Sequence, residues 1–129
     1  MSKQQIRPTE SELAILQILW QLGPSSVRTV NEALNDKREV GYTTTLKIMQ
    51  IMLEKELVVR NTESRTHIYD AAVFEADVQN QLLRKFVQTA YRGSASRLVM
   101  QLLGNHSASP QELDQIKNLI EELEKEQSK

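Results

Sequence analysis

Four polar side chains between residues 43 and 54 recur at the spacing that brings them to one side of an α-helix. They are Thr43, Lys47, Gln50 and Glu54. A glutamine amide can pair with an adenine edge, a lysine ammonium reaches a guanine edge or a phosphate, and a threonine bonds a phosphate or contacts a thymine methyl group. The chemistry that this face offers is therefore contact with the bases and the backbone of DNA.

The opposite side of the same helix is apolar enough to pack on a core. At 3.6 residues per turn it gathers Thr45, Ile48, Met49 and Met52. Thr44, Leu46 and Ile51 flank the polar face, and the two apolar residues among them favour a surface that a partner covers. The helix is thus predicted to pack on one side and to bind on the other.

The elements around this helix predict how it is positioned. A capping box of Thr9 and Glu12 begins a first apolar helix, which Gly23-Pro24 ends, and Ser25 or Ser26 then caps a second helix. After the polar helix, two short β-branched runs joined by a polar turn predict a β-hairpin that ends near Tyr69. Three helices and a hairpin wing are typical of a mainly α, winged helix-turn-helix fold, whose third helix enters the major groove.

The second half of the chain predicts further helices with one apolar side each. One runs from Phe74 to Tyr91, a second from Ala95 to Leu103, and Ser109-Pro110 begins the last. Because such short helices cannot bury these sides alone, we expect residues 1–72 to bind DNA and residues 73–129 to form a helical dimerisation domain. The residues expected in the dimer interface are Val78, Leu82, Phe86, Leu98, Leu102, Leu113, Ile116, Ile120 and Leu123.

Charge is the general feature that argues against DNA binding by a single copy. Residues 1–70 hold nine Lys plus Arg and nine Asp plus Glu, so the predicted binding domain is neutral. Phosphate contacts normally supply much of the affinity for DNA. Useful affinity is therefore expected from a homodimer, in which two copies bind together.

Composition excludes several other classes. The chain has no cysteine, hence no disulfide and no thiolate metal site, and its two histidines, His67 and His106, lie in separate halves without paired ligands. No signal segment, membrane-spanning run, phosphate-binding loop or catalytic constellation is recognisable. We expect a cytoplasmic protein that is not an enzyme, has no cofactor or metal, and does not insert into a membrane.

The ordered motifs resemble those of the penicillinase-repressor family of bacterial regulators, of the BlaI, MecI and CopY type. The matching stretches are PTESELAILQILWQLGPSSVRTVNEAL, GYTTTLKIMQIMLEKELVVR and SRTHIY, and the helical tail extends the likeness over essentially the whole chain. The resemblance implies a homodimeric repressor that binds double-stranded, dyad-symmetric operator DNA and blocks transcription. It places a recognition helix at residues 42–55 and implies DNA contacts by Arg28, Thr43, Thr44, Lys47, Gln50, Arg60, Arg65 and His67.

Three features depart from the family pattern. Members controlled by a membrane sensor protease are cut at an Asn-Phe bond, and the corresponding pair here is Gln101-Leu102, a possible cleavage position with a different specificity. The copper-responsive members bind metal through a cysteine-rich tail that this chain does not have. Glu56 stands where the family commonly has glycine after the recognition helix, and the backbone there is less favourable for glutamate.

Two alternative interpretations remain open from the sequence. The run Thr43–Thr45 suits the start of a helix as well as it suits DNA contact. Near-neutral charge also fits a winged-helix module that dimerises and binds another protein instead of specific DNA. The salt dependence of binding distinguishes a DNA-binding protein from a protein-binding module, because binding to phosphates weakens steeply as the salt concentration rises.

Overall fold

The computed structural model describes residues 7–128, which form six helices and a small sheet. The chain divides into two compact units, Met1–Leu83 and Arg84–Lys129, with the division inside helix α4 (Glu75–Tyr91). The predicted boundary after residue 72 lies ahead of this division. The first part of α4 therefore belongs to the same unit as the winged helix. The Trp20 indole N–H also donates to the Val73 carbonyl at 3.0 Å, which ties the segment just before α4 to the first helix.

Helix α1 (Glu10–Leu22) begins and ends as its sequence predicts. The Thr9 hydroxyl accepts from the Glu12 backbone N–H at 3.1 Å, and the Glu12 carboxylate accepts from the Thr9 N–H at 2.9 Å. Gly23 follows the helix with φ of 82°, a left-handed conformation that glycine adopts without steric cost. Both predicted ends of the first helix are confirmed.

A third strand joins the predicted hairpin. Strands β2 (Val58–Asn61) and β3 (Ile68–Ala71) pair antiparallel, as expected, and β1 (Ser25–Ser26) pairs with the other edge of β3. Ser25 lies opposite Tyr69 in this register. Two serines have no strand-like pattern of their own, so only pairing with a distant segment makes them a strand. Ser26 is also the cap of α2 (Val27–Asn35), since its hydroxyl accepts from the Thr29 N–H at 3.2 Å.

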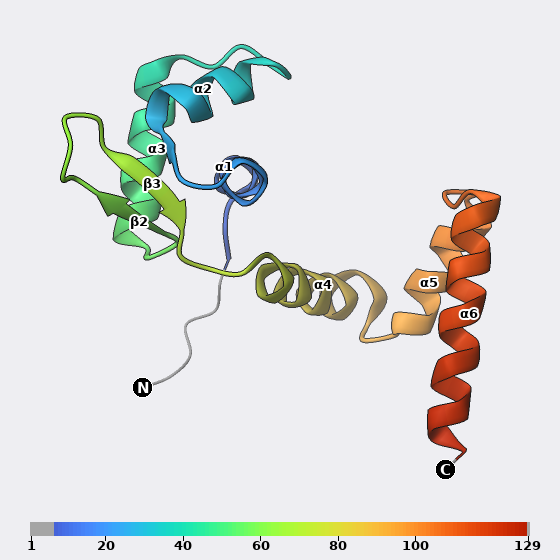
Figure 1. Ribbon diagram of the computed structural model, residues 1–129. Helices are drawn as coiled ribbons and strands as arrows, with labels where there is room; N and C mark the ends of the chain where they lie inside the picture. Colours follow the sequence, from blue (N-terminus) through green and yellow to red (C-terminus); the bar gives the residue numbers. More distant parts are fainter. Residues whose placement is uncertain (1–6, 129) are drawn as a thin grey trace. The chain divides into compact units, whose positions relative to one another are not determined.

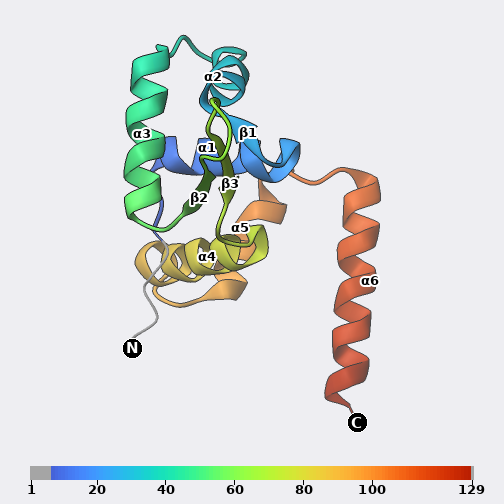
Figure 2. The same cartoon turned by 60° about the vertical axis from the view of Figure 1, so that its left-hand side comes forward.

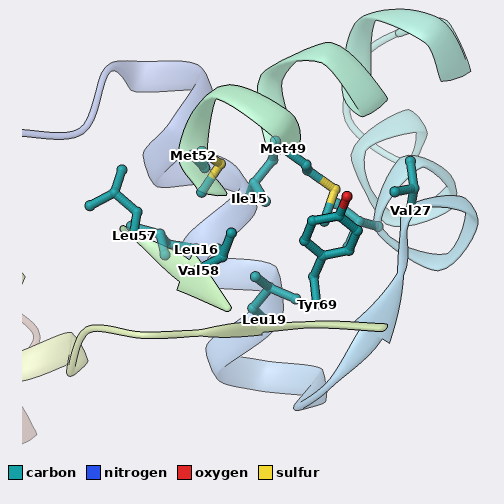
Figure 3. Packing of buried hydrophobic residues seen from close by; sticks show 10 residues of the cluster. Ile15, Leu16, Leu19, Val27, Met49, Met52, Leu57, Val58 and Tyr69 are labelled. Atoms are coloured by element: carbon teal, nitrogen blue, oxygen red, sulfur yellow. The ribbon is translucent and has the colours of Figure 1, made fainter. Parts of the chain in front are cut away.

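The core of the first unit lies between three helices and the sheet (Figure 1). Figure 3 shows its side chains converging from α1, α3 (Tyr42–Glu54), β2 and β3. Met49, Met52 and Thr45 of α3 are fully buried, so the predicted inner side of this helix is confirmed. The largest buried apolar side chains of the cluster are Ile15, Leu16, Leu19, Val30, Met49, Met52, Val58 and Tyr69. Helices and wing in this order make the first unit a winged helix-turn-helix, and the predicted fold class is confirmed.

A left-handed residue ends α3 and turns the chain into β2. Glu56 has φ of 65°, its N–H donates to Leu53, and the next N–H, of Leu57, donates to Met52 at 2.9 Å. This pair of bonds is the Schellman motif, in which glycine normally takes the place of Glu56. Leu57 is buried beside the core, so the turn cannot relax outward without exposing it.

We expect Glu56→Gly to stabilise the protein by about 0.5–1.5 kcal/mol, because glycine removes the steric cost of a left-handed backbone. Urea denaturation followed by far-ultraviolet circular dichroism measures the change. Glu56→Ala is the matched control, since it removes the same carboxylate and keeps the backbone cost. An equal gain in both variants would assign the effect to charge and contradict the backbone explanation.

The second unit contains the end of α4, α5 (Ala95–Gly104) and α6 (Pro110–Gln127). The predicted break at Arg92-Gly93-Ser94 is confirmed, and α5 extends one residue past the predicted end, to Gly104. Ser109 and Glu112 form a capping box at the predicted start of α6, with bonds of 2.8 and 3.1 Å. A hydrogen bond with the Ser109 backbone N–H, and to a smaller extent one with the Ser109 side chain, holds the pKa of Glu112 below its usual value. The stabilisation of α6 that comes from this lowered pKa is fully present above the usual glutamate pKa, and it is lost as the pH falls through the lowered pKa of Glu112.

The apolar stripe of α6 is left uncovered in the single chain. None of its described residues is buried, and Leu113, Ile120 and Leu123 are 45–48% exposed. Phe86 of α4 and Leu102 of α5 are both 49% exposed. Val78 and Leu98, two of the residues expected at a dimer interface, are by contrast already buried in the single chain. The uncovered apolar surface is thus spread over all three helices, because Leu83 of α4 and Val99 and Met100 of α5 are exposed as well.

Candidate nucleic-acid interface

The outer side of α3 presents the predicted polar residues to solvent. Thr43, Thr44, Lys47 and Gln50 are all exposed, while Thr45 on the inner side is fully buried. Figure 2 shows α3 standing beside the hairpin, and Tyr42 and Leu46 of α3 line one groove together with residues of the wing turn. Whether these four residues contact DNA stays a prediction, but their side chains are free of the core.

The threonine run does not cap the helix. The N-cap residue is Gly41, which has no side-chain cap hydrogen bond, and the helix begins at Tyr42. Thr45 uses its hydroxyl within the fold, where it donates to the Gly41 carbonyl at 3.4 Å. The capping interpretation therefore does not account for Thr43 and Thr44, whose hydroxyls face solvent on the outer side.

A groove brings together three of the predicted basic residues. Arg28 comes from the first turn of α2, and Arg65 and His67 come from the wing turn, although 37 positions separate Arg28 from Arg65. The groove measures about 440 Å³ and is completed by the start of α3. Its lining residues are Ser26, Val27, Arg28, Tyr42, Leu46, Arg65, Thr66, His67 and Tyr69. None of these lining residues is acidic, so the groove offers an anion three basic side chains.

Arg60 takes a different place from the other wing residues. It lies on β2 directly opposite Tyr69 of β3, and its side chain is exposed. It is not among the residues that line the groove. The strand register places it on the same side of the sheet as the buried residues Val58 and Tyr69, although its own side chain is exposed.

Two asparagines tie α2 to the beginning of α3. The Asn31 amide donates to the buried Thr45 hydroxyl at 2.8 Å and to the Val40 carbonyl at 3.0 Å. Asn35 donates to the same Val40 carbonyl at 3.0 Å and accepts from the Val40 N–H at 3.0 Å. These bonds hold both polar backbone groups of Val40, just before the helix. The turn between α2 and α3 is thereby fixed, and with it the start of the outer side.

A partly buried ion pair holds the other end of α3. The Lys55 ammonium lies 2.8 Å from the Glu12 carboxylate, whose side chain is 4% exposed. The same carboxylate closes the capping box of α1 by accepting from the Thr9 N–H. The carboxylate therefore joins the first turn of α1 to the end of α3, and its burial makes the pairing matter more than a surface salt bridge.

The role of Asn31 was not predicted from the sequence, because its partner Thr45 lies 14 residues away in the chain. The available signal was the spacing of Asn31 and Asn35, which places two amides on one side of a helix directly before the turn.

We expect Asn31→Asp to lower the free energy of unfolding by about 1–3 kcal/mol, because a carboxylate cannot donate to the Val40 carbonyl or to buried Thr45. Asn61→Asp is the matched control, since the Asn61 side chain accepts from the Glu63 N–H and aspartate keeps that bond. Urea denaturation of both variants measures the difference. Equal stability of the two would show that the Asn31 bonds contribute nothing beyond the change of charge.

The possible cleavage position lies within a helix. Gln101 and Leu102 are exposed residues of α5, and the Gln101 carbonyl accepts from the Asn105 N–H at 3.0 Å. The Gln101 side chain also accepts from the Tyr91 hydroxyl at 2.9 Å. Cleavage between them would require the last turns of α5 to open first, because the peptide bond is held in a hydrogen-bonded helix.

Nowhere in residues 7–128 do three or more histidine, aspartate or glutamate side chains gather in a way that could hold a metal ion. Over the same range, no helix is long and apolar enough to cross a bilayer.

Comparison with known proteins agrees with this architecture. A solved structure of the hsRosR-S4 complex aligns with a TM-score of 0.52 at 18% sequence identity, over 77% of this chain and 89% of that one. At this identity the likeness concerns the fold alone. The fold and the outward polar helix beside a wing define a winged-helix protein.

Sequence comparison then identifies the family. The penicillinase repressor family model matches residues 8–122. The transcriptional regulator BlaI of Mycobacterium tuberculosis is 30% identical over 116 residues, covering 88% of this chain and 82% of the relative. The penicillinase repressor of Bacillus licheniformis is 26% identical over 120 residues, covering 88% and 89%. The chain belongs to the penicillinase repressor family, a family of transcriptional regulators and not of enzymes.

Proposed function

We propose that this protein is a homodimeric transcriptional repressor that binds dyad-symmetric operator DNA and blocks transcription. The observation that carries the proposal is the outer side of α3, where Thr43, Lys47 and Gln50 are exposed opposite a fully buried stripe. In this proposal α3 reads bases in the major groove, and Arg28, Arg60, Arg65 and His67 bind the backbone and set the register. The names of the two relatives, a transcriptional regulator and a penicillinase repressor, support the same function.

Dimerisation is proposed because one copy has neither the charge nor the coverage to act alone. The first 70 residues hold as many acids as bases, so phosphate attraction to a single copy is weak. The α6 stripe of Leu113, Ile120 and Leu123 is about half exposed, and a second copy would cover it. We assign DNA binding to residues 1–72 and dimerisation to residues 73–129.

Release of the operator is assigned to a signal that alters the dimerisation domain. The family resemblance implies one route, which is cleavage by a membrane sensor protease, and the corresponding bond is Gln101-Leu102. Both residues lie within the hydrogen-bonded helix α5, so a protease would need that helix to open before it could cut this bond.

The proposal is tested by binding of the purified protein to DNA fragments from upstream of its own coding sequence. Gel shift and fluorescence anisotropy should detect a preferred palindromic segment, with affinity that falls steeply as salt rises. Absence of binding, or binding that salt does not weaken, would contradict the repressor and favour a winged-helix module that docks on protein.

Lys47→Ala combined with Gln50→Ala should leave the fold and the dimer intact and should lower discrimination for the operator. The expected loss is about 1–3 kcal/mol for each base contact removed. Anisotropy titrations with operator and scrambled duplexes measure it. Gln115→Ala combined with Lys117→Ala, an exposed pair of the same types on α6, is the control. Unchanged discrimination in the α3 double variant would reject both residues as readers of sequence.

Ile120→Asp combined with Leu123→Asp should weaken the dimer and, through it, operator affinity, because two carboxylates would enter an apolar seam. Sedimentation velocity and anisotropy measure the two effects. Gln115→Asp combined with Asn118→Asp adds the same charge on the other side of α6 and should change neither. A dimer that survives the first double variant would move the interface to residues 74–103.

A further inference from the structure

One of the ionisable side chains that line the groove between α2, α3 and the wing is a histidine. His67 is exposed and lines the groove with Arg28 and Arg65. The ionisable groups that line it are Arg28 of α2, Tyr42 of α3, Arg65 of the wing turn, His67 and, at its buried base, Tyr69 of β3. Arginine and tyrosine keep their charge states between pH 5 and 8, whereas histidine side chains titrate in this range.

The geometry of the groove suits a phosphate more than a neutral ligand. The first turns of α2 and α3 both open onto it, through Ser26, Val27 and Arg28 and through Tyr42. Helix N-termini attract anions because their first N–H groups lack partners within the helix. No acidic side chain belongs to its lining, so nothing there would neutralise the arginines or compensate a protonated imidazole.

We propose that this groove seats a backbone phosphate of DNA and that His67 binds it as the imidazolium, so DNA binding takes up a proton. This inference rests on the proposed function and adds a regulated property to its site. An added positive charge at His67 strengthens attraction to the phosphate, and the bound phosphate in turn stabilises the protonated ring. By linkage, affinity for DNA then falls as pH rises, at most tenfold per pH unit for each proton taken up.

The experiment is an anisotropy titration of the full-length protein with a short labelled duplex of arbitrary sequence, at low constant salt and at about pH 6 and pH 8. An operator is unnecessary, because the groove contacts phosphate and not bases. The wild-type protein should bind about three- to tenfold more weakly at the higher pH for each engaged copy. His67→Gln should bind with the wild-type affinity of pH 8 at both values, and His67→Lys should bind tightly at both.

His106→Gln is the matched control, because His106 is the other histidine of the chain and is exposed in the loop between α5 and α6. It should keep the full pH dependence, and sedimentation at both pH values shows whether the oligomeric state is constant. Binding by the wild-type protein with the same pH profile as His67→Gln would overturn this inference and leave the proposed function standing. Absence of binding to any duplex at either pH would overturn both.

Discussion

The surface that this protein presents depends on the rotation of one helix. Thr45, Met49 and Met52 of α3 are fully buried, and the 3.6-residue period then places Thr43, Lys47 and Gln50 outside. Turning α3 about its axis would carry a lysine and a glutamine into an apolar core, at a cost of several kcal/mol for the charge alone. The surface that we propose to bind DNA is therefore a consequence of how the core packs.

Both ends of α3 are held by polar groups that reach it from other helices. At its start, Asn31 donates to buried Thr45 and to the backbone just ahead of the helix. At its end, the nearly buried Glu12 carboxylate binds Lys55, and a left-handed Glu56 redirects the chain into β2. Core packing sets the rotation of α3, whereas these bonds set where it starts and stops. Together they present one rigid side to a partner.

The features that could be predicted from the sequence are those that depend on residues close together in the chain. The capping boxes at Thr9 and Ser109 and the two sides of α3 depend on residues three or four positions apart, so local pattern suffices. Strand β1, the Asn31 bonds and the groove each join segments that are far apart in the chain, and nothing local marks them. The dimer interface stays a prediction, because periodicity alone does not tell whether an apolar residue such as Val78, which is buried in the single chain, is covered by its own chain or by a partner.

Because the first 70 residues hold as many acidic as basic side chains, we propose that two copies must cooperate to bind DNA. Hydroxyl-radical footprinting of the upstream DNA tests it most directly, with protein concentration varied across the dimerisation range. The account predicts two protected half-sites whose centres lie about one helical turn, or a small multiple of it, apart, and which become protected together as dimer forms. Strong protection of one half-site at concentrations where sedimentation finds only single chains would contradict it.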